Sequence, residues 1–155
     1  MGKRELPEQL QFLASRRAVQ RTTDASMKGK VCVVAGSTSG VGLQAARRIA
    51  RAGADIVMVC RDRAKADPIR AEITRETGVR ADIVIADFRD LASVRAAAGE
   101  LLGRFPRIDV LVNSAGIHST TRTFTAAGLE TVFCVNHLAP FLLTQLLLQR
   151  VRQSA

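Results

Sequence analysis

Four short, apolar, mainly β-branched runs recur along the chain, at residues 31–34, 56–60, 83–86 and 108–112. Each run is nearly continuous in apolar residues rather than alternating, which is typical of parallel strands covered on both faces. Their spacing is regular, at 25, 27 and 27 residues from Val31 to Val110, so each gap has room for a crossover helix. Because such crossovers are right-handed, the pattern predicts an α/β doubly wound parallel sheet with strand order 3-2-1-4.

The segments between these runs have helical patterns. In the first, three alanines and Ile49 share one face opposite three arginines, and Gly53 is placed to end the helix. The second, 63–77, is polar, and we expect its helix to start near Pro68 or to be kinked there. The third has apolar residues at intervals of three and four, with Asp90 placed to cap it.

The last segment, 129–152, predicts one long helix with a kink at Pro140. Its apolar residues cover nearly the whole circumference, so the helix should be buried all round. The sheet can cover only one face, and we expect the other to need a further segment, a complementary chain or self-association. We expect the leucine-rich part from Leu138 to Val151 to be too short, and too interrupted by polar residues, to cross a bilayer.

The chain divides into an extension, 1–26, and one domain, 27–155. The extension is basic, with a short helix predicted over 7–20, and it lacks an apolar run long enough for a signal-peptide core. Cys32, Cys60 and Cys134 each lie inside an apolar run, which indicates buried free thiols in a reducing compartment rather than disulfides. We therefore expect a soluble, cytoplasmic protein.

Composition limits the partners. The net charge of +9 comes largely from scattered arginines, which suits an acidic ligand or simply a solvated surface. With 4% aromatic residues and no Trp or Tyr, there are few rings on which nucleic-acid bases could stack, so nucleic-acid binding is disfavoured. His118 and His137 have no Cys, Asp or Glu at ligand spacing, so no metal site is expected.

Candidate chemistry begins directly after the first strand, in a glycine-rich turn. Gly36 allows a sharp turn, Gly40 lets backbone amides approach a pyrophosphate, and Gly42 lets the next helix pack close to the sheet. The free N–H groups at that helix start favour an anion. The candidate dinucleotide-binding residues of this turn are Gly36, Ser37, Thr38, Ser39, Gly40, Val41 and Gly42. In the predicted topology, residues 113–116 meet this turn at the switch point between strands one and four.

Together with three later motifs, this turn resembles the short-chain dehydrogenase/reductase family from Lys28 onward. Residues 35–42 resemble Thr-Gly-x-x-x-Gly-x-Gly with Ala35 in place of Thr, and residues 113–116 resemble Asn-Asn-Ala-Gly with Ser114 at the second Asn. Asp87-Phe88 resembles the family's Asp after the third strand, which contacts adenine, and residues 133–144 resemble the family's long fourth-helix motif. The segments 60–62 and 136–138 are most similar to the retinol-dehydrogenase-type branch of the family.

The resemblance implies a Rossmann-like coenzyme-binding fold, truncated after the fourth strand and the long helix, and hydride transfer between a nicotinamide dinucleotide and an alcohol or carbonyl. Asn136 would be the asparagine of the catalytic tetrad, although it could instead satisfy backbone carbonyls freed at Pro140. The further coenzyme contacts that the resemblance implies are Asp87, Phe88, Asn113, Ala115 and Gly116.

Arg61 lies just past the second strand. At this position an acidic residue would accept a hydrogen bond from the ribose 2′-hydroxyl of NAD, whereas an arginine suits the extra phosphate of NADP. NADP is the preferred prediction, with NAD open because Asp62 is adjacent. The family continues into a catalytic Ser and a Tyr-x-x-x-Lys motif, and this sequence contains no Tyr. We therefore predict the coenzyme-binding part of an oxidoreductase, which is inactive by itself and is completed by another segment or chain. The alternative is a non-catalytic dinucleotide-binding or interaction protein.

Overall fold

A four-stranded parallel sheet forms the centre of the protein. The computed structural model describes residues 23–154, so the helix predicted over 7–20 lies outside the described residues. The strands are β1 (Val31–Ala35), β2 (Asp55–Cys60), β3 (Ala81–Ile85) and β4 (Val110–Asn113). Their order is β3-β2-β1-β4, which confirms the predicted topology.

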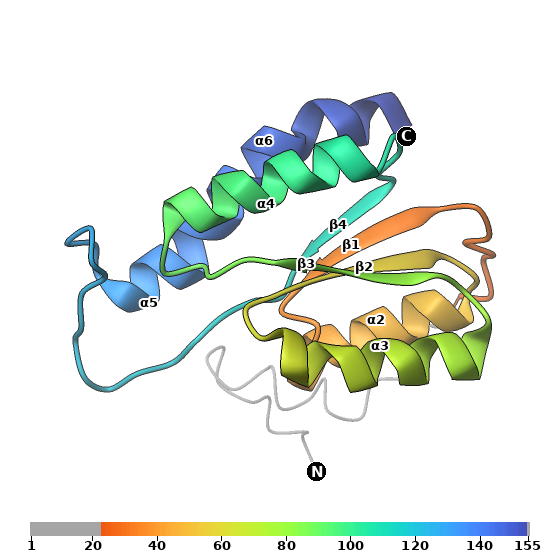
Figure 1. Cartoon of the computed structure of the whole chain (residues 1–155), viewed down its shortest axis with the longest axis horizontal. Coiled ribbons are helices and arrows are strands. Elements are labelled where there is room, and N and C mark those ends of the chain that lie inside the picture. The colour runs from red at the N-terminus through yellow and green to blue at the C-terminus, as the bar shows by residue number, and fades with distance from the viewer. Residues whose placement is uncertain (1–22, 155) are drawn as a thin grey trace, which may run out of the picture.

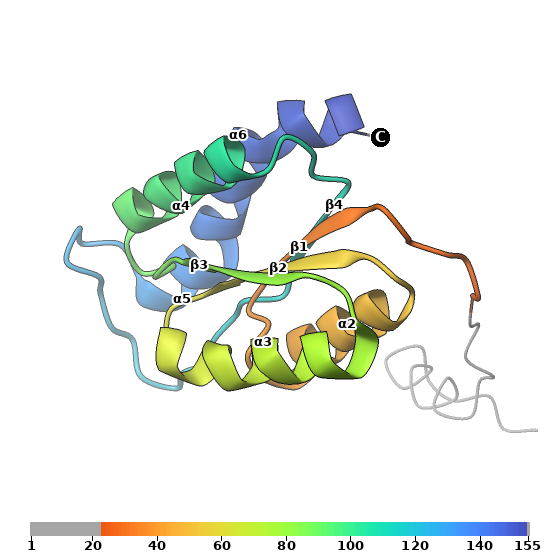
Figure 2. The same cartoon turned by 45° about the vertical axis from the view of Figure 1, so that its right-hand side comes forward.

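Two pairs of helices cover the two faces of this sheet (Figures 1 and 2). α2 (Gly40–Arg51) and α3 (Arg63–Thr77) lie on one face, and α4 (Leu91–Arg104) and α6 (Ala139–Ser154) on the other. Neighbouring residues of β1 point to opposite faces, as in any strand. Val33 and Ala35 join the core under α4 and α6, whereas Cys32 and Val34 join the core under α2 and α3. All four are fully buried, as the continuous apolar runs predicted.

Acidic caps fix the starts of α3 and α4, and the cap of α3 corrects the sequence prediction. Asp90 accepts a hydrogen bond from the backbone N–H of Ala92, which confirms it as the cap of α4. The expected start of α3 near Pro68 is wrong: the helix begins at Arg63 and continues through Pro68. Asp62 provides the earlier start, because its carboxylate accepts from the backbone N–H of Lys65 at 3.2 Å.

The long final helix has an irregularity just before its proline rather than a break at it. It begins with α5 (Thr131–Phe133), widens into the π-helical turn η3 (Cys134–Leu138) and continues as α6. A proline ring normally clashes with the carbonyl four residues earlier, which here is that of Asn136. The wider π turn spans that carbonyl, so α6 accommodates Pro140 near its start.

This helix is only partly covered by the described residues. Ala139, Leu143 and Leu147 are fully buried against the sheet and α4, but Phe133 and Phe141 remain 52% and 58% exposed. The helix from Thr131 to Ser154 has 24 residues, and an 18-residue stretch of it has a mean hydropathy of 1.5, so by length and composition it is long and apolar enough to cross a membrane. The helix is therefore longer than the stretch 138–151 on which the sequence prediction was based, and the absence of a membrane span stays a prediction.

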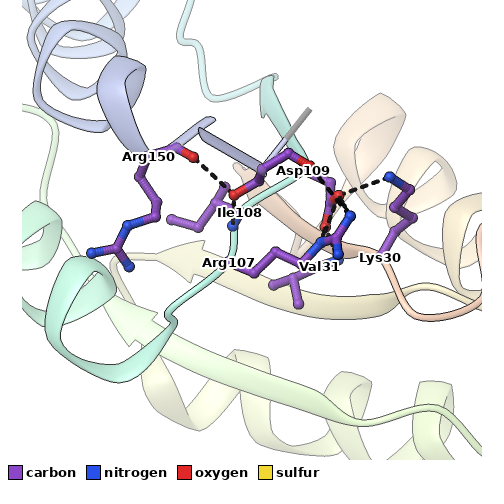
Figure 3. A network of polar contacts seen from close by, with 7 residues as sticks. Lys30, Val31, Arg107, Ile108, Asp109 and Arg150 are labelled. Carbon is purple, nitrogen blue, oxygen red and sulfur yellow. Dashed lines mark hydrogen bonds and ion pairs between the residues drawn. The ribbon is translucent and has the colours of Figure 1, made fainter. Parts of the chain in front are cut away.

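A polar network joins the start of β4 to the start of β1 and to the end of α6 (Figure 3). The Asp109 carboxylate, 3% exposed, accepts from Lys30 Nζ at 3.0 Å, from the Val31 backbone N–H at 2.9 Å, and from Arg107. Ser154 Oγ accepts from the Ile108 N–H at 3.1 Å, which secures the last turn of α6. These contacts lie at the end of the sheet opposite the glycine-rich turn.

Candidate functional site

One cavity of about 830 Å³ opens at the carboxyl ends of the strands, where the glycine-rich turn meets the segment after β4. Ligands of doubly wound sheets bind at this switch point. Eleven of the predicted coenzyme-binding residues line the cavity, namely Gly36, Thr38, Ser39, Gly40, Val41, Gly42, Arg61, Asp87, Phe88, Ala115 and Gly116. Residues up to 80 positions apart, from Gly36 to Gly116, are thus gathered by the strand order rather than by sequence proximity.

The three glycines of the turn meet different constraints. Gly36 has φ +79°, and a Cβ there would lie 2.6 Å from the backbone of Ala115. A Cβ on Gly42 would lie 2.2 Å from the Gly36 carbonyl oxygen, so both positions require the absence of a side chain. Gly40 has φ +55° but nothing of the chain within 4 Å of a Cβ. Its open side faces the cavity, which is the approach that a bound phosphate needs.

The start of α2 lacks an acidic cap, unlike the starts of α3 and α4. Its N-cap residue, Ser39, makes no side-chain capping bond, and its first turn contains no acidic residue. α3 and α4, by contrast, are capped by Asp62 and Asp90. Uncapped N–H groups at the positive end of a helix dipole favour an anion, and this end faces the cavity.

Charged side chains gather where β2 and β3 end. Asp87 follows β3, and Arg89 binds its carboxylate through Nε and Nη2, the shorter contact being 2.6 Å. The pKa of Asp87 is lowered, first by this hydrogen bond and less by the charge of nearby Arg61, so the carboxylate is ionised. Within the described residues Arg61 makes no ion pair of its own, whereas the Asp62 carboxylate is occupied as the α3 cap.

Two predicted residues lie outside the cavity lining. Ser37 is fully buried beneath the turn, and its hydroxyl has no hydrogen-bond partner among the described residues. The Asn113 amide donates instead to Thr144 Oγ1 at 2.9 Å, and Thr144 donates to the Pro140 carbonyl at 2.7 Å. Asn113 therefore ties β4 to the start of α6, and a direct coenzyme contact by either residue stays a prediction.

Asn136 also has a positioning contact. Its Oδ1 accepts from the Ile117 backbone N–H and its Nδ2 donates to the Ile117 carbonyl, both at 2.8 Å. The alternative that it satisfies carbonyls freed at Pro140 is therefore wrong. The side-chain amide of Asn136, bonded in this way, holds the chain after Gly116 against the π-helical turn. The approach is close, because a Cβ on Gly116 would lie 3.4 Å from Asn136 Oδ1. Asn136 thus fixes the wall of the cavity that residues 115–117 form.

Several cavity residues were missed from the sequence. Ile117 and Ser119 follow the 113–116 motif directly, and their position could have indicated them. Thr123 and Thr131 could not be found this way, because a small antiparallel turn brings them together through an Oγ1–Oγ1 hydrogen bond of 2.9 Å. Glu130 stabilises that turn by accepting from the N–H groups of Val132 and Phe133, which lowers its pKa.

The cavity holds few groups able to move a proton. Among residues 23–154, its titratable lining residues are Cys60, Arg61, Asp87 and Arg89. Burial raises the pKa of the Cys60 thiol, and it raises that of Cys32 to about 11, so these buried free cysteines are protonated and unreactive at neutral pH. No group of three or more potential metal ligands occurs in the described part of the chain.

The family model described as short chain dehydrogenase matches residues 30–155. The chain belongs to the short-chain dehydrogenase family. It is 42% identical over 132 residues to dehydrogenase/reductase SDR family member 13 of Bos taurus, covering 84% of this chain and 34% of that protein. It is 39% identical over 135 residues to retinol dehydrogenase 12 of Mus musculus, covering 86% and 43%. These relatives confirm the resemblance to the retinol-dehydrogenase-type branch, and the chain spans less than half of their length.

Solved structures support the fold. A crystal structure of L-sorbose reductase from Gluconobacter frateurii, complexed with NADPH and L-sorbose, matches with a TM-score of 0.73 and 28% identity, covering 84% of this chain and 51% of that one. An alcohol dehydrogenase from the archaeon Thermococcus sibiricus, complexed with 5-hydroxy-NADP, matches with a TM-score of 0.72 and 26% identity, covering 81% and 54%. The short-chain dehydrogenase fold and its nicotinamide dinucleotide site are thereby supported for this chain.

Proposed function

We propose that this chain is the coenzyme-binding part of a short-chain oxidoreductase and that it binds NADP(H) in preference to NAD(H). The observation that carries the proposal is the cavity at the switch point, with an uncapped helix start on one side and two glycines that leave no room for a Cβ. The backbone N–H groups of residues 38–42 would hold the pyrophosphate, and Asp87 and Phe88 would border the adenine. The bound nicotinamide would supply or accept the hydride.

The preference for NADP(H) rests on the residues after β2. Arg61 lines the cavity and makes no ion pair within the described residues, so its guanidinium is available to a 2′-phosphate. The Asp62 carboxylate accepts from the Lys65 N–H at the start of α3, and Asp62 is not among the residues that line the cavity. Both observations favour the phosphorylated coenzyme.

Titration of NADPH and NADH, followed by nicotinamide fluorescence, tests this proposal. Arg61→Asp should weaken NADPH binding by about tenfold or more and leave NADH binding little changed. Gly40→Val should abolish binding of both, because its side chain would enter the space that the phosphates need. Gly78→Val is the matched control: φ is +72°, a Cβ there also meets nothing, and the residue lies outside the cavity. Equal binding by Gly40→Val and Gly78→Val would refute the site.

The second candidate is a dinucleotide-binding protein without turnover. It is favoured by the cavity lining, whose titratable groups are two arginines, one ionised aspartate and one buried thiol. None of these is a good proton donor to a carbonyl near neutral pH, and the sequence contains no Tyr. Oxidation of NADPH by aldehydes with the chain alone would exclude this candidate, whereas binding of NADPH without oxidation is expected of both candidates.

A partner for the uncovered apolar surface is part of the proposal. β4 pairs only with β1 among the described strands, so its outer edge has unpaired backbone groups. Phe133 and Phe141 are exposed on the adjacent long helix. A complementary chain segment or a second copy would cover both features.

A further inference from the structure

The Arg89 side chain is directed at Asp87 from two residues further along the chain. Its Nε lies 3.1 Å from each carboxylate oxygen of Asp87 and its Nη2 lies 2.6 Å from Oδ2. The Arg89 backbone N–H also donates to Oδ1 at 2.9 Å. Both oxygens of Asp87 therefore accept from Arg89, and both residues line the cavity.

Arg61 lies at the same end of the cavity. β2 and β3 are paired with Cys60 opposite Ile85, so Arg61 and Asp87 follow adjacent strand ends. This end of the cavity carries two guanidinium groups and one carboxylate, a net charge of one positive. Without Arg89, the carboxylate of Asp87 would offset the charge of Arg61 and repel any phosphate nearby.

We propose that Arg89 is a specificity-determining residue of the coenzyme site. By neutralising Asp87, it leaves the charge of Arg61 uncompensated for a ligand that has a phosphate on the 2′ position of its adenosine. This inference rests on the proposed function, because it requires the cavity to bind an adenosine nucleotide. It adds to that function a residue that acts through Asp87 rather than on the phosphate itself.

The fold does not need the Arg89 side chain. Its guanidinium is 54% exposed and the Asp87 side chain 33% exposed, and ion pairs that open to solvent contribute little to stability. The turn after β3 is held by backbone groups: the Asp90 N–H donates to the Asp87 carbonyl at 3.0 Å, and the Asp87 N–H donates to Ser93 Oγ. Removing the side chain should change the charge of the cavity without unfolding its wall.

The test measures binding of 2′,5′-ADP and 5′-ADP to the full chain by calorimetry. Both probes contain adenine, so any lost adenine contact cancels in the ratio of their affinities. Arg89→Ala should lower the preference for 2′,5′-ADP by about two- to fivefold. Arg95→Ala, a matched loss of an exposed arginine on α4 outside the cavity, should leave the ratio unchanged. Arg89→Lys, which keeps the charge, should retain most of the preference.

Asp87→Asn in the Arg89→Ala background decides how Arg89 acts. If Arg89 works by neutralising Asp87, removing that negative charge restores the wild-type ratio. Failure to restore it, or an unchanged ratio in Arg89→Ala, would overturn the inference while leaving the proposed function intact. Absence of binding of both probes and of NADPH to the wild-type chain would overturn the proposed function, and this inference with it.

Discussion

The Asp109 carboxylate connects the start of β4 to the start of β1, and its replacement by asparagine measures what that connection contributes to stability. Asparagine has nearly the same shape and keeps one oxygen that can accept from the Val31 N–H. It loses the charge that Lys30 and Arg107 bind. These two cations are 42% and 47% exposed, so water can solvate them after the change and neither becomes a buried unpaired charge.

The expected decrease in the free energy of unfolding follows from these contacts. A charge-assisted hydrogen bond to a buried group contributes about 1.5–3 kcal/mol, and half-exposed partners reduce that value. We expect Asp109→Asn to lower the free energy of unfolding by about 2–3 kcal/mol at pH 7. Asp109→Ala should lower it by a further ~1–2 kcal/mol, because the Val31 N–H then has no side-chain acceptor.

The pH dependence identifies the charge as the cause. The Arg107 hydrogen bonds hold the pKa of Asp109 well below its ordinary value of 3.8. A lowered pKa contributes stability that is complete above the unfolded-state pKa and is lost as pH falls toward the folded-state pKa. The difference between wild type and Asp109→Asn should therefore shrink below about pH 4, by up to about 1.4 kcal/mol per pH unit.

Urea unfolding followed by far-ultraviolet circular dichroism gives these values at pH 7 and pH 3. Asp67→Asn is the matched control, because Asp67 is 46% exposed and faces Arg70 at 3.5 Å. It should change the free energy of unfolding by less than about 0.5 kcal/mol at either pH. A wild-type midpoint in Asp109→Asn, or an equal loss at pH 7 and pH 3, would refute the reasoning.

Three further outcomes are expected. The chain alone should give no change in NADPH absorbance with aldehydes or ketones; a rate that disappears on Asn136→Ala would contradict this. Asn136→Ala should lower the free energy of unfolding by about 1–2 kcal/mol, since the Ile117 backbone loses two hydrogen bonds, and an unchanged thermal midpoint would show that water replaces them. Light scattering at low micromolar concentration should find self-association that Phe133→Ser with Phe141→Ser reduces; a wild-type monomer would contradict it.

The sheet could be predicted because its determinants are local. Each strand is a continuous apolar run, each gap has the length of one crossover helix, and handedness then fixes the order. The glycine-rich turn is equally local, since Gly36 and Gly42 are needed where a strand turns into a helix. Asp90 was predicted as a cap for the same reason, because the backbone N–H that it binds, that of Ala92, lies only two residues further along the chain.

The features that could not be predicted depend on pairs far apart in the sequence. Asn113 meets Thr144 across 31 residues, and Asn136 meets Ile117 across 19. Neither pair leaves a periodic signal, because a polar residue inside an apolar run does not indicate its partner. The start of α3 was missed for another reason: Pro68 is a strong local signal, and the weaker cap signal of Asp62 overrode it.

The position of β4 in the sheet has a kinetic consequence. Val31 pairs with Asp55, 24 residues later, whereas Cys32 pairs with Val110, 78 residues later. Closing the longer loop costs about 1 kcal/mol more in chain entropy, so β1, β2 and β3 should associate before β4 docks. The wall formed by residues 114–117 arrives with β4. The cavity is therefore the last part of the molecule to be completed during folding, and a refolding chain should acquire ligand affinity only in its slowest phase.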